Sequence, residues 1–217
     1  MSQELQTRTA QQDYFSVFEL PRKLNVDTAA LEKQFYAKSR QLHPDRFASK
    51  SRDQQEAATE QSSLLNDAYR TLKDPIARTK YLLSLEGVQL EEQSKSATDA
   101  ARAGGTQKKQ AVPPELLEEV FELNMQLQEM KMAREMGEEA DTDVRQGLEV
   151  ARASFQAKLR DIDNELRGLW SRWDAAIDSN NDAQRMSTRD QMVEVLNRRN
   201  YIRNLVRDVN DALEASQ

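Results

Sequence analysis

The chain has 217 residues, of which 38% are hydrophobic and 31% are charged, and its formal net charge is −6. It contains no cysteine and one histidine, which excludes disulfides, thiol catalysis and metal sites built on cysteine ligands. The acidic balance argues against a general nucleic-acid-binding protein, and no apolar run approaches the roughly 20 residues that cross a bilayer. The N-terminal segment lacks the apolar stretch of a signal peptide, so we expect a cytoplasmic protein. With only 6 glycines and 5 prolines, the fold is predicted to be all-α.

The first half of the chain predicts short helices around one helical hairpin. A polar tail, residues 1–12, precedes an apolar segment that Pro21 stops. Asp27 is a suitable N-cap for a helix that continues to about Leu42. A second amphipathic helix is expected over 53–72, and a short one over 75–87 after the Asp-Pro break. We therefore assign residues 13–88 to one domain.

The second half predicts three long amphipathic helices. Residues 89–112 are polar and small, contain a Gly-Gly pair, and indicate a linker. From residue 113 to 217, apolar residues recur at helical spacing in three segments, the last over about 188–214, which together predict an antiparallel three-helix bundle. Trp170 and Trp173 lie in the longest of these helices and are expected in its core.

The only histidine stands in the tripeptide His43-Pro44-Asp45, between the two helices of the predicted hairpin. Taken alone, the tripeptide is equally well explained as a helix stop, because proline disfavours α geometry in the residue before it. Its position favours a second interpretation, a rigid loop that offers a carboxylate beside a cationic helix face and so docks a partner. No nucleophile or metal constellation accompanies the histidine, so we expect no enzyme activity and no cofactor.

Residues 13–83 resemble a J domain. The matching positions are Tyr14, Leu31, Phe35, the His43-Pro44-Asp45 loop, Asn66, Ala68, Tyr69, Leu72, Asp74, Pro75, Arg78 and Tyr81. The resemblance implies a co-chaperone that stimulates ATP hydrolysis by a DnaK-type heat-shock chaperone. The chaperone-binding residues that it implies are His43, Pro44, Asp45, Lys33, Lys38, Arg40 and Arg46.

The J domain and the acidic three-helix bundle that follows it together resemble the HscB/Jac-type co-chaperones of iron–sulfur cluster biogenesis. The resemblance rests on FASKS after the tripeptide, on DPIARTKYLLSLEG, and on the segment LLEEVFELNMQLQE of an acidic bundle. It implies that the bundle binds an IscU-type cluster scaffold and presents it to a DnaK/HscA-type chaperone. The client-binding residues that it implies are Leu117, Phe121, Glu122, Met125, Glu129 and Tyr201, although Met125 stands where the family pattern is acidic.

The residues themselves also indicate a contact surface on the first bundle helix. Beside its core positions runs a second apolar line, Leu117, Phe121, Met125 and Met132, among acidic residues. We expect Leu117, Phe121 and Tyr201 to share one exposed patch. The alternative is that the wider apolar arc contacts two helices at once. At the level of function, the alternatives are a J-domain protein for another client and a helical adaptor with no chaperone role; neither nucleic acid nor a membrane is an expected partner.

Overall fold

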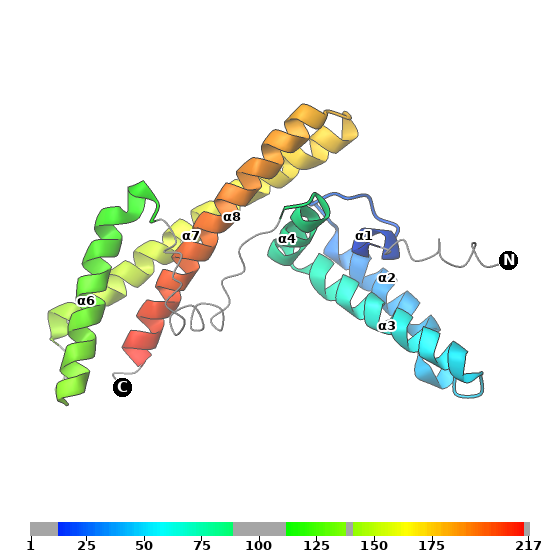
Figure 1. Cartoon of the computed structure of the whole chain (residues 1–217), viewed down its shortest axis with the longest axis horizontal. Coiled ribbons are helices and arrows are strands. Elements are labelled where there is room, and N and C mark those ends of the chain that lie inside the picture. The colour runs from blue at the N-terminus through cyan, green and yellow to red at the C-terminus, as the bar shows by residue number, and fades with distance from the viewer. Residues whose placement is uncertain (1–12, 89–111, 138–140, 215–217) are drawn as a thin grey trace. The chain divides into compact units, whose positions relative to one another are not determined.

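The computed structural model describes residues 13–88, 112–137 and 141–214 (Figure 1). The predicted tail 1–12 and nearly all of the predicted linker 89–112 lie outside these ranges. The described residues form helices and short turns without a strand, which confirms the all-α prediction. They divide into two compact units: unit 1 combines the N-terminal part up to residue 89 with residues 170–187, and unit 2 holds the rest.

Unit 1 contains four helices and a 3₁₀ turn from the N-terminal part of the chain. These are α1 (Tyr14–Val17), α2 (Thr28–Gln41), η1 (Pro44–Arg46), α3 (Arg52–Lys73) and α4 (Pro75–Leu85). Side chains of Asp27, Ser51 and Asp74 accept hydrogen bonds from the first-turn N–H groups of α2, α3 and α4, as N-caps do. Asp74 is followed by proline at the first helical position of α4, which needs no hydrogen-bond partner there.

The core of unit 1 is built from the apolar faces of these helices. Its fully or nearly buried members are Phe15, Phe18, Leu24, Leu31, Leu65, Leu72, Leu82 and Leu83. Two ring stacks lie beside it, Tyr14 on Tyr81 with centroids 4.3 Å apart and Phe35 on Tyr69 at 4.2 Å. The guanidinium of Arg78 is buried and donates to the backbone carbonyls of Leu24 and Leu72, so a charged side chain joins three segments of the unit.

The end of α7 (Thr142–Asp178) and the start of α8 (Asp182–Glu214) complete unit 1. The indole Nε1 of Trp173 donates to the carbonyl of Arg22 at 3.0 Å. The Asp174 carboxylate accepts three hydrogen bonds, from Leu24 N at 2.7 Å, Asn25 N at 2.9 Å and Asn25 Nδ2 at 2.8 Å. We call these contacts the clasp. They bind the loop that leads into α2 to a segment about 150 residues later in the sequence.

Unit 2 contains the remaining helical elements, η2 (Pro114–Leu116) and α6 (Leu117–Met136), together with most of α7 (Thr142–Asp178) and α8 (Asp182–Glu214). Gly137, with φ at +72°, ends α6 in the left-handed conformation that glycine adopts without strain. Asp141 caps α7, since its side chain accepts from Asp143 N at 3.0 Å. α8 begins six residues before the expected position, because Asn181 accepts from Gln184 N and starts the helix directly after a short turn.

The three long helices bury apolar residues that recur at helical spacing. At the first of them these are Leu116 of η2 and Val120, Leu123 and Met130 of α6, with Leu127 half-buried. Trp170 and Trp173 are 7% and 0% exposed, which confirms them as core residues. Ion pairs join neighbouring helices at the surface: Lys158 of α7 lies 3.0 Å from Glu119 of α6, and Arg199 of α8 lies 2.7 Å from Asp163 of α7.

Candidate functional site

The tripeptide His43-Pro44-Asp45 forms an exposed loop between α2 and α3. α2 ends at Gln41, the turn η1 follows, and the N–H of Arg46 donates to the carbonyl of His43 at 3.0 Å. Because proline disfavours α geometry at the preceding residue, α2 ends before His43. Pro44 thus explains why a short, hydrogen-bonded loop follows α2 at the end of the hairpin.

The side chains of His43 and Asp45 face solvent, with 58% and 88% of their surfaces exposed. The N–H of Asp45 lies 3.3 Å from Nδ1 of His43, and the Asp45 carboxylate lies 3.3 Å from the same nitrogen. In a neutral imidazole one nitrogen accepts and the other carries the proton, so a His43 ring that accepts at Nδ1 donates from Nε2. With Nδ1 accepting from the backbone, the loop presents an N–H donor and a carboxylate to a partner.

Three of the four predicted cationic side chains are exposed on α2 or on the turn that follows it. Lys33, Arg40 and Arg46 are exposed, and we call them the basic face. Lys38 differs, because its Nζ lies 3.0 Å from the Glu19 carboxylate and only a third of its side chain is exposed.

The structure adds Tyr36, which our sequence analysis missed, to the α2 part of this surface. Its side chain is 56% exposed, three residues after Lys33 and four before Arg40. Residues at these spacings share one side of a helix. The signal was present in the sequence as an aromatic residue on the polar side of α2.

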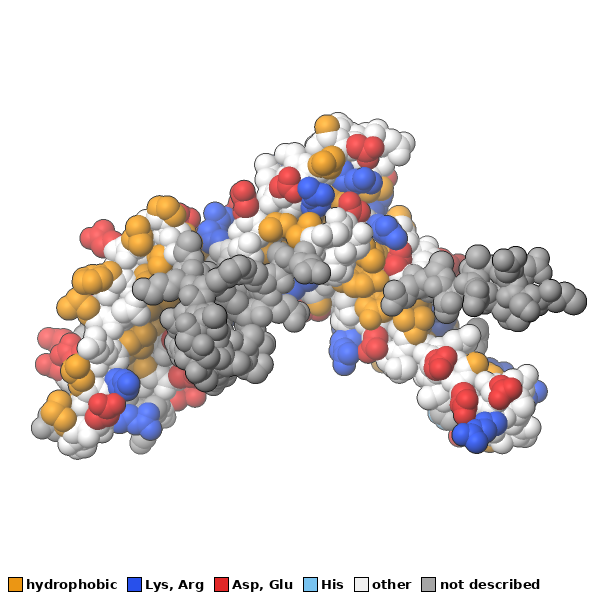
Figure 2. Space-filling view, in the orientation of Figure 1, with side chains coloured by type: hydrophobic (Ala, Val, Ile, Leu, Met, Phe, Trp, Pro, Cys, Tyr) orange, Lys and Arg blue, Asp and Glu red, His pale blue; other side chains and the backbone are white. Residues whose placement is uncertain are grey.

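A line of large apolar side chains runs along the exposed side of α6. Its members, which we call the α6 stripe, are Leu117, Phe121, Met125, Met132 and Met136, and they are 48–67% exposed. Figure 2 shows them as part of the orange surface at the left of the view, interrupted by acidic side chains. Within unit 2, the exposure of the stripe contradicts the alternative that a second helix buries it.

Acidic residues flank the N-terminal part of the α6 stripe. Glu118, Glu122 and Glu129 are all exposed on α6. They lie within one helical turn of Phe121 or Met125, so apolar and anionic groups alternate along the same face. Such a face is complementary to a partner segment that carries apolar and basic side chains.

Tyr201 does not belong to this exposed surface, and the prediction of a shared patch with Leu117 and Phe121 is wrong in that respect. Its side chain is only 9% exposed, and burial raises the pKa of its phenol. α8 buries three successive residues at 200–202. Three consecutive helical positions span about 200° of the circumference, so more than one neighbour covers this part of α8.

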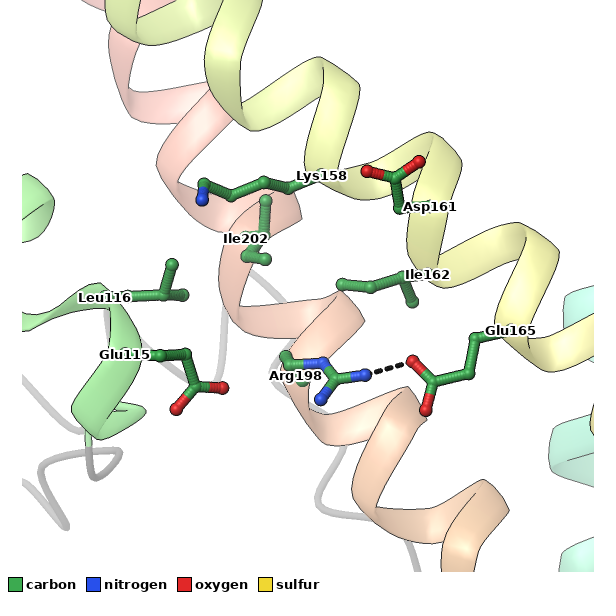
Figure 3. Close-up of a pocket in the computed structure, with 8 residues that line it drawn as sticks. All are labelled: Glu115, Leu116, Lys158, Asp161, Ile162, Glu165, Arg198 and Ile202. Atoms are coloured by element: carbon green, nitrogen blue, oxygen red, sulfur yellow. Dashed lines mark hydrogen bonds and ion pairs between the residues drawn. The ribbon is translucent and has the colours of Figure 1, made fainter.

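Unit 2 also has a cleft of about 250 Å³ between η2, α7 and α8 (Figure 3). Leu116, Ile162 and Ile202 form its apolar lining, and charged side chains surround them, among which Arg198 pairs with Glu165. The lining has no histidine, hydroxyl or thiol, so it holds no pair of nucleophile and base. Its ion pair serves to join α7 and α8.

The comparisons with known proteins agree with this arrangement. A model of the DnaJ domain matches residues 13–81. The fold is similar to that of the chaperone HscB from Vibrio cholerae, at 25% sequence identity and a TM-score of 0.56, covering 94% of this chain and 99% of that one. It is also similar to the human co-chaperone protein HscB, at 23% identity and a TM-score of 0.57, over 93% of this chain and 82% of that one. The chain thus carries a DnaJ domain in its N-terminal part, and over most of its length it has the fold of the HscB-type co-chaperones.

Proposed function

We propose that the chain is a co-chaperone, and not an enzyme, that stimulates the ATPase of a DnaK/HscA-type chaperone and delivers an IscU-type iron–sulfur scaffold to it. The observation that carries the proposal is the exposed His43-Pro44-Asp45 loop within a DnaJ domain, joined to a helical unit with an exposed apolar and acidic face. We propose that this activity takes place in the cytoplasm.

The chaperone side of the proposal rests on the charges around the loop. A carboxylate held on a short turn suits a charge-assisted hydrogen bond with an arginine of the partner. The basic face would steer an acidic chaperone surface toward that loop, because complementary charges act mainly on the rate of encounter.

The client side rests on the α6 stripe and its acids. Large apolar side chains exposed in a group, with a polar rim, are typical of a protein-binding surface. The whole sequence contains no cysteine and one histidine. It therefore lacks the thiolates that hold iron–sulfur clusters, and in our proposal the cluster stays on the scaffold as cargo.

The ATPase test compares the full chain with His43→Gln and Asp45→Ala, each added to a DnaK-type chaperone in steady-state ATP hydrolysis. We expect both variants to lose stimulation while their unfolding free energies stay within about 0.5 kcal/mol of the parent, as for other surface loops. Full stimulation by either variant would contradict the J-domain function. No stimulation by the parent chain would favour a helical adaptor.

The client test is separate, because the loop variants keep the α6 stripe. Isothermal titration of the full chain with an IscU-type scaffold should give the same affinity for the parent and for His43→Gln. Absence of binding in the parent, together with normal ATPase stimulation, would assign the chain to another client.

A further inference from the structure

Methionine is concentrated on the exposed surface of α6. Met125, Met132 and Met136 are 58%, 48% and 66% exposed. In contrast, Met130 of the same helix and Met192 of α8 are 4% and 0% exposed. Three of the five members of the α6 stripe are therefore solvent-exposed methionines. Among the other methionines in the described residues, Met186 is exposed and the rest are buried.

Thioether side chains suit a binding surface because they are apolar, polarizable and flexible. The same side chains are the ones that mild oxidants convert to a polar, chiral sulfoxide. An exposed methionine reacts more readily than a buried one, so the oxidation of this chain is directed to the proposed client surface rather than to its core.

We propose that the α6 stripe is an oxidation-sensitive switch, in which hydroperoxides convert its methionines to sulfoxides and release the client. This inference rests on the proposed function, since it concerns the same client-binding surface. It adds a modification site and a means of regulation that binding alone does not imply.

The chemical step needs only a hydroperoxide. The thioether sulfur attacks one peroxide oxygen, so that an S–O bond forms while the O–O bond breaks. Sulfur loses two electrons, and the second oxygen leaves as water, or as an alcohol from an organic peroxide, taking the proton of the transferred oxygen. Methionine sulfoxide reductases reverse the change with thiol electrons.

The acids beside Met125 explain why the sulfoxide would disfavour binding. A sulfoxide oxygen accepts hydrogen bonds, and Glu122 and Glu129, three residues before and four after Met125, are acceptors too. When the apolar side chains of a client cover this part of the stripe, the new oxygen loses water, and the two acids offer it no donor in return. Burying a polar group without a partner costs about 1.4 kcal/mol or more, so oxidation should weaken the complex by about tenfold or more.

The experiment uses the full chain, treated with hydrogen peroxide and then with catalase so that the scaffold never meets the oxidant. Peptide mass spectrometry should show sulfoxide at Met125, Met132 and Met136 before Met130 and Met192. Titration with an IscU-type scaffold should show the loss of affinity, and a methionine sulfoxide reductase should restore it. Circular dichroism should be unchanged, because the core methionines are protected.

A matched variant separates the switch from general damage. Met125→Leu combined with Met132→Leu and Met136→Leu keeps apolar side chains of similar volume. Whatever affinity this variant has for the scaffold, that affinity should be the same before and after peroxide. Met186→Leu removes an exposed methionine of unit 1 and should stay as sensitive as the parent. An oxidised parent with unchanged affinity, or a triple variant that loses as much affinity as the parent, would overturn the switch. An untreated parent that fails to bind the scaffold would instead overturn the client assignment of the proposed function.

Discussion

Replacement of Asp174 by alanine tests whether the clasp holds the loop before α2 in place. The carboxylate accepts hydrogen bonds from Leu24 N, Asn25 N and Asn25 Nδ2, at 2.7–2.9 Å. Burial lowers the pKa of the Arg78 guanidinium. The negative charge of Asp174 acts in the opposite direction, because it favours the charged form of Arg78. The substitution therefore removes three acceptor contacts and a compensating charge together.

The expected loss of stability follows from which donors can reach water. The two donors of Asn25 are exposed and can bind solvent, whereas Leu24 N is partly buried. A hydrogen bond to a charged group contributes about 1.5–3 kcal/mol, so we count mainly the Leu24 bond and expect Asp174→Ala to cost about 2 kcal/mol. With a urea slope of about 2 kcal/mol/M, the midpoint of unfolding should fall by about 1 M.

Tryptophan fluorescence is the appropriate assay, because the two tryptophans of the chain, Trp170 and Trp173, both lie in the part of α7 that completes unit 1. Asp178→Ala is the matched control. Asp178 pairs with Lys23 at 2.5 Å in an exposed ion pair, and such pairs contribute within about 1 kcal/mol. If the two variants shift the midpoint equally, the Asp174 hydrogen bonds do not hold the loop.

Raising ionic strength should slow association with a DnaK-type chaperone, because the basic face is exposed and salt screens exposed charges. Association rates that stay constant in stopped-flow measurements from about 50 to 500 mM salt would show that the basic face does not steer the chaperone. Burial raises the pKa of Asp13, but the Ser16 N–H and Arg22 outweigh burial, so the pKa in the folded chain is lowered overall. The Asp13 carboxylate therefore stabilises the fold at pH values above its pKa in the unfolded chain, about 3.9, and this stabilisation is lost as the pH falls through the folded-state pKa. Asp13→Asn should therefore flatten the acid side of the stability profile, measured by urea unfolding, and an unchanged profile would contradict the assignment. Leu117→Ala combined with Phe121→Ala should weaken scaffold binding by more than about tenfold in calorimetric titration without loss of helicity, and unfolding of the variant would show that these exposed side chains support the core.

The local features of the fold could be predicted because their causes are local. Asp27 and the Asp74-Pro75 pair cap helices through residues two or three positions away, and Pro44 ends α2 through its direct neighbour. The exposure of Phe121 was also predictable, since α6 has more apolar positions than one seam requires. These are short-range or periodic signals, which a single sequence carries.

The features that sequence analysis missed depend on contacts between distant segments. Asp174 looks like any solvated acid on α7, and only the folded chain shows its bonds to Leu24 and Asn25, about 150 residues away. The pairing of Lys38 with Glu19, in the loop after α1, was likewise not visible in the sequence. Tyr201 was expected on the surface because the family resemblance places it at a client-binding position, but its side chain is buried in the fold of this chain.

The clasp has a consequence for how the DnaJ domain of this chain is understood. The family match ends at residue 81, yet the unit that contains it also takes in residues 170–187. Without those residues, the carbonyl of Arg22 and the N–H of Leu24 lose the partners that Trp173 and Asp174 provide. Both backbone groups lie in the loop that leads into α2, the helix that carries part of the basic face and ends at the His43-Pro44-Asp45 loop. Because a hydrogen bond contributes about 0.5–1.5 kcal/mol, or about 1.5–3 kcal/mol when one partner is charged, α7 stabilises the entry of the helix that carries part of the proposed chaperone-docking surface.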